Sequence, residues 1–111
     1  MKLPNADRAI VPEAKLRDYL LSPWHREGKS KARLFRALGY SQDNWQQLEA
    51  DIRAQHLTQD AIEVAPDDFG RRWRIEAPLR GPSGSARIVT VWMIPTGREE
   101  PSFVTAYQAR R

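Results

Sequence analysis

The sequence predicts an α+β fold in which three N-terminal helices pack on a C-terminal antiparallel sheet of about four strands. Apolar residues recur every three or four positions up to about residue 58, and mostly every second position from about residue 59 onward. The composition, 41% hydrophobic and 29% charged, is typical of a globular protein. We therefore expect a single domain over residues 1–111, with a helical half over about 1–58 and a sheet half over about 59–111.

Capping residues delimit the three expected helices. The first begins at Pro12, because proline suits the first helical position, and ends at Ser22 before a second proline. The second is capped by Ser30 and ends at Gly39, which is expected to be left-handed, and the third is capped by Ser41. The residues spaced to face a core are Leu16, Tyr19 and Leu20, then Leu34, Phe35 and Leu38, then Trp45, Leu48 and Ile52.

Turn residues separate the expected strands. The strands are Ile62–Val64, Arg72–Leu79, Arg87–Ile94 and Ser102–Gln108. Glycine-containing turns lie at Asp67–Gly70 and Gly81–Gly84, and a polar loop lies at Pro95–Pro101. The third strand is nearly all apolar, so we expect it to be a central strand covered on both faces.

The charge is distributed unevenly along the chain. Lys and Arg against Asp and Glu number nine against four in Met1–Tyr40, one against seven in Ser41–Asp68, and eight against three in Phe69–Arg111. The formal net charge is +4. If the two basic segments meet in the fold, they form a positive surface suited to an anionic partner, with nucleic acid first among the candidates. Alternatively, these side chains only solvate an ordinary surface.

The composition disfavours several classes of site. Cysteine is absent, which excludes disulfides, thiolate metal sites and a thiol nucleophile. The two histidines lie far apart in the sequence, so we expect neither a metal nor another cofactor. The sequence starts without the apolar run of a signal peptide and has no segment long enough to cross a bilayer. We therefore expect a cytoplasmic protein with no membrane contact.

Two arginines of the second strand are expected on one open face of the sheet. Arg72 and Arg74 alternate with Trp73 and Ile75. If the apolar pair faces the helices, both guanidinium groups share the other face and are suited to bind a phosphate bidentately. The alternative is that the arginines only line a solvated face.

The last strand is expected to add a hydroxyl and a phenol to that face. Phe103, Thr105 and Tyr107 alternate with Val104 and Ala106. If the smaller apolar pair packs against the helices, Thr105 and Tyr107 lie on the arginine side, where they are suited to orient a phosphate and stack on a base. The alternative is that both aromatic residues belong to the core.

A second cationic cluster surrounds the start of the second helix. Lys29, Lys31 and Arg33 lie where backbone N–H groups and the helix dipole also favour an anion. His25, in the preceding loop, is the best candidate for proton transfer near neutral pH. The alternative is an ordinary surface loop with its lysines in solvent.

Two tryptophans and the second histidine complete the candidates. Trp24 and Trp92 are suited to stack on bases, although buried packing is the favoured interpretation of Trp92. His56 is expected at the end of the third helix, where a cation interacts favourably with the dipole, and needs no catalytic role.

Motifs along nearly the whole chain resemble one family of small bacterial domains of unknown function. They are Leu3–Ala6, Lys15–Leu21, His25–Gly28 with Lys31–Arg33, Phe35 with Leu38–Tyr40, Gly70–Trp73, Thr90–Trp92 and Val104–Tyr107. Members of the family occur as free-standing proteins, often in apparent toxin–antitoxin pairs, and at the tips of larger secreted toxins. The resemblance implies a toxin with a small, acidic antitoxin or immunity protein as its partner.

A wider similarity joins the chain to the superfamily of barnase, colicin-type tRNases and ribosome-dependent mRNA interferases. It implies a metal-independent endoribonuclease acting on tRNA or mRNA. The motifs carry over to His25, Lys31, Thr105 and Tyr107 as catalytic residues. From the residue patterns above, the side chains expected to bind the substrate are Lys29, Arg33, Arg72, Arg74 and Trp92.

One departure from the family pattern concerns an arginine. The resemblance implies an arginine before the Val-Thr-Ala-Tyr block, where this chain has Pro101-Ser102-Phe103. Arg72, Arg74 or Arg98 is then expected to replace it. The alternative function is a non-catalytic basic domain that binds an acidic antitoxin or ribosomal protein. Its candidate acidic surface is formed by Asp43, Glu49, Asp51 and Asp60.

Overall fold

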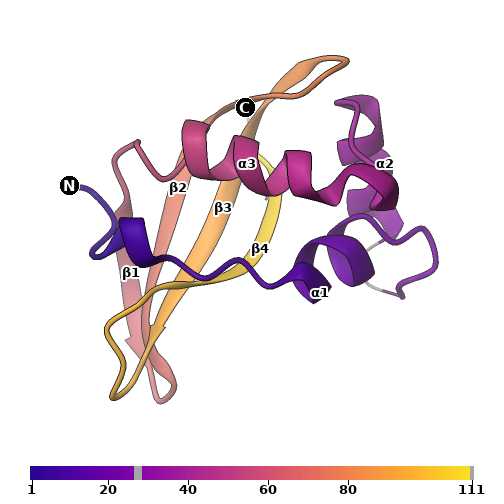
Figure 1. Ribbon diagram of the computed structural model, residues 1–111. Helices are drawn as coiled ribbons and strands as arrows, with labels where there is room; N and C mark the ends of the chain where they lie inside the picture. Colours follow the sequence, from indigo (N-terminus) through magenta and orange to yellow (C-terminus); the bar gives the residue numbers. More distant parts are fainter. Residues whose placement is uncertain (27–28, 111) are drawn as a thin grey trace.

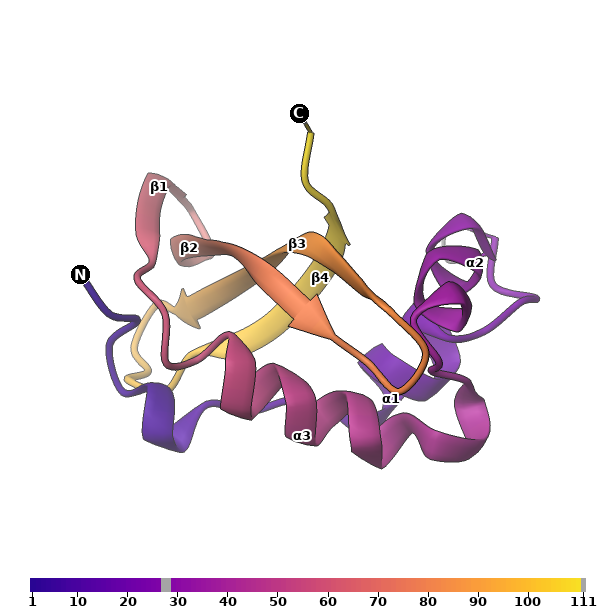
Figure 2. The ribbon, with the colours of Figure 1, turned by 90° about the horizontal axis from the view of Figure 1, so that it is seen from above.

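The computed structural model describes residues 1–26 and 29–110, without the side chain of Lys29. It has an antiparallel four-stranded sheet with the strand order β1-β2-β3-β4, and α3 lies across one face of this sheet (Figure 1; Figure 2). The helical elements are η1 (Ala6–Arg8), α1 (Glu13–Lys15), η2 (Leu16–Leu20), α2 (Lys29–Ala37), η3 (Gln42–Asn44) and α3 (Trp45–Gln55). The strands are β1 (Ile62–Asp67), β2 (Gly70–Arg80), β3 (Ser85–Pro95) and β4 (Ser102–Gln108). The α+β class and the order of helices before strands are confirmed.

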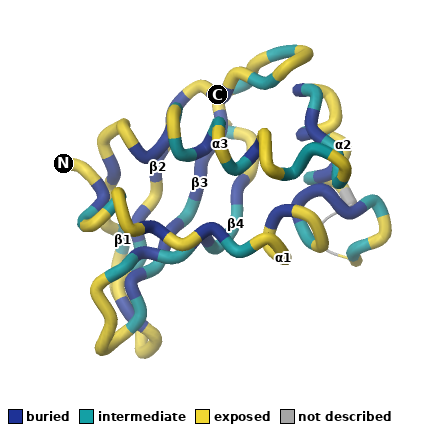
Figure 3. Tube along the Cα trace, viewed as in Figure 1, coloured by how far each residue is buried: buried dark blue, intermediate teal, exposed yellow. Residues whose placement is uncertain are grey.

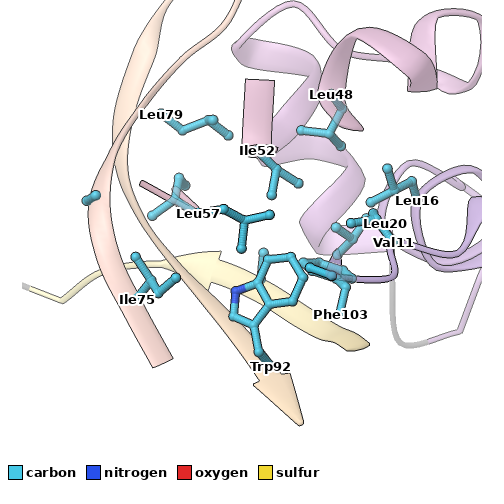
Figure 4. Close-up of a cluster of buried hydrophobic side chains, with 14 of the residues drawn as sticks. Val11, Leu16, Leu20, Leu48, Ile52, Leu57, Ile75, Leu79, Trp92 and Phe103 are labelled. Atoms are coloured by element: carbon cyan, nitrogen blue, oxygen red, sulfur yellow. The ribbon is translucent and has the colours of Figure 1, made fainter. Parts of the chain in front are cut away.

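The core lies between α3 and one face of the sheet (Figure 4). On β2, Trp73 and Ile75 face α3, as their alternation with arginines predicts, and both are almost completely buried. Leu48 and Ile52 of α3 are fully buried against them. Burial of each such side chain contributes about 1.5–3 kcal/mol. This packing fixes which face of the sheet remains open.

The first helix is shorter and more irregular than predicted. After α1, the chain forms a π-helical turn, η2, in which the backbone N–H of Leu21 donates to the carbonyl oxygen of Leu16 at 2.8 Å. Wide turns of this type often occur at functional sites. α2 also differs, because it begins at Lys29, so the predicted cap Ser30 lies inside the helix.

The end of α2 agrees with the prediction. Gly39 has a φ of 102°, and the N–H of Tyr40 donates to the carbonyl oxygen of Phe35 at 3.0 Å. A Cβ atom on Gly39 would lie 2.8 Å from the backbone nitrogen of Ser83. That nitrogen donates to the carbonyl oxygen of Leu38 at 2.9 Å, so the β2–β3 turn is anchored on the end of α2.

The first twelve residues pack along the sheet, which was not predicted. Ile10 forms a parallel bridge with Ser102 at the start of β4, and Leu3, Ala9 and Val11 are buried (Figure 3). The apolar residues of this segment do not keep a strand or helix spacing over its whole length. The described residues contain no helix that is long and apolar enough to span a membrane.

A bulge in β4 changes the predicted orientation of Phe103. Thr105 pairs with Val91, whereas Phe103 pairs with Trp92, so Val104 is the extra residue. The bulge places Phe103 on the core face, where its ring lies edge-on to that of Trp92 with the centroids 5.4 Å apart. The prediction that Phe103 shares a face with Thr105 and Tyr107 is therefore wrong, and only Ala106 of the predicted apolar pair is fully buried.

The central position of β3 is confirmed, but its coverage is less complete than predicted. Ile88, Val89 and Thr90 are consecutive buried residues, so both faces are covered there. Val91 and Met93, on the face away from α3, are only half-buried. The open face of the sheet therefore begins beyond Thr90.

Candidate functional site

The site is built on β4, one edge strand of the sheet. Thr105 and Tyr107 lie on the face away from α3, because they pair with Val91 and Val89 while Ala106 faces the core. The predicted placement of Thr105 and Tyr107 on the open face is thus confirmed, although only Ala106 of the predicted apolar pair is fully buried. Thr105 is half-buried and Tyr107 is partly exposed.

Lys31 brings a cation from α2 to this strand. Its ammonium nitrogen donates to the carbonyl oxygen of Ala106 at 3.1 Å and lies 5.6 Å from the centroid of the Tyr107 ring. A lysine carries three N–H donors, and this carbonyl accepts one of them. The others remain able to donate to an anion on the same side of β4.

Tyr19 joins His25 to the strand. Its hydroxyl oxygen lies 3.1 Å from Oγ1 of Thr105, and its ring meets the His25 ring edge-on with the centroids 5.1 Å apart. Oγ of the buried Ser22 accepts hydrogen bonds from the backbone N–H groups of Trp24 and His25, at 3.2 and 3.1 Å. This serine therefore holds the turn that carries the histidine against Tyr19.

The structure thus brings His25 and Thr105 into contact with a residue that was not predicted, Tyr19, and brings Lys31 to Tyr107 on the same strand. We call Tyr19, His25, Lys31, Thr105 and Tyr107 the β4-edge cluster. Tyr19 occupies an apolar position of the first helix, and its spacing therefore predicted a core residue. Its hydroxyl was the available signal, because a partly buried tyrosine usually finds a polar partner for its O–H.

The predicted substrate-binding cations fall in different places. Arg74 and Thr105 both pair with Val91, so their side chains lie level with each other on the open face. Their Cα atoms are two strand spacings, or about 10 Å, apart. Nε of Arg72 instead donates to the carboxylate of Asp67 at 2.7 Å, which holds the pKa of that carboxyl below its usual value. Arg74 is therefore the best candidate to replace the arginine that the family pattern has before the Val-Thr-Ala-Tyr block, since Arg98 lies in the β3–β4 loop.

Arg33 lies apart from the cluster. It is exposed on α2 and lines a hollow of about 320 Å³ together with Arg36. The side chain of Lys29 lies outside the described residues, so its predicted role stays a prediction.

A family model for a domain of unknown function, DUF6883, matches residues 2–110. The chain belongs to the DUF6883 family. The predicted resemblance to a family of small domains of unknown function is thereby confirmed. No curated protein and no solved structure matches this DUF6883 domain.

Trp92 of the DUF6883 domain is not part of the site. Its side chain is fully buried on the core face, and Nε1 donates to Oγ1 of Thr90 at 3.0 Å. A ring without exposed surface cannot stack on a base, so the assignment of Trp92 to substrate binding is corrected. Its favoured interpretation as a buried residue is confirmed.

His56 continues the same buried network. Its Nε2 lies 3.2 Å from the carbonyl oxygen of Ala77, which can only accept, so Nε2 carries the proton and Nδ1 accepts from the Thr90 hydroxyl at 2.9 Å. Burial lowers the pKa of His56 to about 4. The residue is therefore neutral, and the expected cation at the end of α3 is wrong.

The acidic residues that the alternative function needs are mostly engaged within the domain. Glu49 pairs with Arg53 at 3.0 Å, Asp51 accepts from Tyr40 and Gln47, and Asp60 pairs with the amino terminus at 3.3 Å. Among the residues described, no three His, Asp or Glu side chains are grouped as metal ligands would be.

Proposed function

We propose that this DUF6883 domain is a metal-independent endoribonuclease that cleaves tRNA or mRNA. The observation that carries the proposal is the β4-edge cluster, in which the Lys31 ammonium lies beside Tyr107 of β4 and the His25 imidazole is linked through Tyr19 to Thr105 of the same strand. The proposal that it acts as the toxin of a toxin–antitoxin pair rests on the family resemblance alone.

RNA supplies the nucleophile for this reaction. The 2′-oxygen attacks the adjacent phosphorus, the P–O2′ bond forms and the P–O5′ bond breaks. The products are a 2′,3′-cyclic phosphate and a 5′-hydroxyl. The protein has to remove the proton of the 2′-hydroxyl, stabilise the negative charge of the phosphorane and protonate the departing 5′-oxygen.

The cluster has a group for each of these tasks. His25 removes the proton from the 2′-hydroxyl, and Tyr107 is the candidate donor to the 5′-oxygen. Lys31 uses the N–H groups that Ala106 does not accept to stabilise the charged phosphorane. Arg74, which lies level with Thr105 across the sheet, assists it. Thr105 orients the phosphate from between them.

The test is cleavage of total RNA by the purified protein in the presence of EDTA, with the new ends mapped. We expect discrete fragments ending in 2′,3′-cyclic phosphate. His25→Ala and Lys31→Ala should each lower the rate by roughly 10²–10⁴-fold and abolish growth inhibition, with the fold intact. Lys2→Ala, a matched change of a distant surface lysine, should leave the rate unchanged.

Two outcomes contradict the proposal. If both variants cleave RNA as fast as the wild type, the site assignment is wrong. If the wild type cleaves no RNA but binds an acidic protein, the domain is the non-catalytic binding module.

A further inference from the structure

One tryptophan of the domain lies almost entirely in solvent beside the β4-edge cluster. The Trp24 side chain is 87% exposed, whereas Trp73 and Trp92 are buried in the core. Its backbone is nevertheless fixed, because the N–H groups of Trp24 and His25 both donate to Oγ of Ser22. The indole is thus presented to solvent by the same turn that positions the proposed general base.

A cationic hollow lies next to this tryptophan. Pro23, which directly precedes Trp24, lines it together with Ser30, Arg33 and Arg36 of α2, and its volume is about 320 Å³. The two arginines are three positions apart and therefore share one face of the helix. Neither guanidinium pairs with a carboxylate of the residues that the structure describes. Their charge is available to an external anion.

An exposed aromatic ring on the turn that borders a hollow with two guanidinium groups offers the combination that binds single-stranded nucleic acid. The ring stacks on a base regardless of its identity, and the arginines bind the phosphate. In a duplex the bases are already stacked within the helix, so only an unpaired base can use the platform.

We propose that Trp24, Arg33 and Arg36 form a subsite for one unpaired nucleotide of the RNA substrate, next to the nucleotide that reacts at His25. The indole stacks on the base and the arginines hold its phosphate. This inference rests on the proposed function, because it takes RNA as the ligand. It also specifies the substrate class as single-stranded RNA.

The test measures binding separately from cleavage. A single-stranded oligonucleotide with 2′-O-methyl groups has no 2′ proton to remove and stays intact, and its binding is followed by quenching of tryptophan emission. Trp24→Ala should weaken the affinity by roughly 5- to 150-fold, whereas Trp24→Phe should retain most of the affinity and lose most of the quenching.

The arginines are tested through the salt dependence of the same binding. Arg33→Gln/Arg36→Gln should lower the slope of log Kd against log salt concentration by about 0.7, the value for one neutralised phosphate on a single strand. The matched controls are Phe69→Ala, a 70% exposed aromatic residue at the β1–β2 turn, and Arg8→Gln in η1. The β1–β2 turn and the N-terminal segment lie away from α2 (Figure 1), so both variants should change the affinity less than twofold.

The outcomes separate the subsite from the catalytic proposal. If Trp24→Ala binds like Phe69→Ala, or if the quenching persists in Trp24→Phe, the subsite is wrong even when RNA is cleaved. If the oligonucleotide is bound with the expected losses but RNA is never cleaved, the subsite stands and the nuclease proposal fails. A wild type that does not bind the oligonucleotide overturns the subsite.

Discussion

The two histidines of this DUF6883 domain lie near threonines on opposite faces of one sheet. On the core face, His56 accepts a hydrogen bond from Thr90 of β3 at 2.9 Å. On the open face, His25 is linked to Thr105 of β4 through Tyr19, with 3.1 Å between the tyrosine and threonine oxygens. Both sites combine an imidazole, a hydroxyl and an aromatic ring.

The two sites differ in how far their histidines are buried. His56 is fully buried, both of its ring nitrogens have protein partners, and desolvation keeps it neutral. His25 is half-buried on a turn at the sheet edge, beside a lysine-bearing helix. The comparison teaches that the same groups stabilise a core when water is excluded, whereas at the sheet edge they keep contact with solvent, as the proposed chemistry requires.

The largest effect on stability is expected from His56→Ala. The substitution leaves a cavity and removes the partners of Thr90 and of the Ala77 carbonyl, so the free energy of unfolding should fall by about 4 kcal/mol. His25→Ala should lower it by less than about 1 kcal/mol, while removing cleavage. Urea denaturation of both variants checks the contrast, which is wrong if His25→Ala is the more destabilised.

A somewhat smaller change in the free energy of unfolding is expected when the pH is lowered. The pKa of His56 is about 4 in the folded domain and 6.5 in the unfolded chain. Between these values the unfolded chain takes up a proton that the folded domain does not. The free energy of unfolding should therefore fall, by up to about 3 kcal/mol, as the pH decreases from about 6.5 to 4.

The control for this pH dependence is His56→Gln, which has no titrating ring and should show a flatter profile over the same interval. Asp60, Glu63 and Asp67 also have a pKa below the usual value, because each pairs with a cation, and all three are retained in this control. An equally steep profile in His56→Gln would assign the dependence to another group.

Tyr19→Phe should affect stability less than His56→Ala does and cleavage less than His25→Ala does. It removes only the hydrogen bond to Thr105, so stability should fall by about 1 kcal/mol and cleavage by about fivefold as Thr105 loses its orientation. Tyr40→Phe is the matched change on the α3 side, where the phenol donates to Asp51 and burial raises its pKa. It should destabilise the domain without changing the cleavage rate. Equal effects of the two variants on cleavage would contradict a positioning role for Tyr19.

Much of the fold follows from local patterns. The bounds of β4 are those predicted, the β1–β2 and β2–β3 turns lie at their glycines, and Gly39 ends α2 as expected. Each of these features depends on neighbours in the sequence, namely on alternation, on turn residues and on a left-handed glycine. The open face of β2 was predictable for the same reason.

The features that were missed depend on contacts between distant segments. The bulge at Val104 arises where β4 pairs with β3, and the π-helical turn at Leu16–Leu20 lies where the first helix packs near the sheet. The hydrogen bond of Tyr19 to Thr105 spans 86 positions. Periodicity within one window of sequence contains no information about such pairs.

By itself, the sequence determined the order of helices and strands, the face of β2 that is buried and the types of residue available for phosphate chemistry. These follow from local backbone preferences and from the hydrophobic effect acting on each segment. Only the tertiary structure decided that His25 lies against Tyr19, that Lys31 reaches β4 and that His56 is neutral. Proximity and desolvation are properties of the packed chain, because they depend on which distant segments exclude water together.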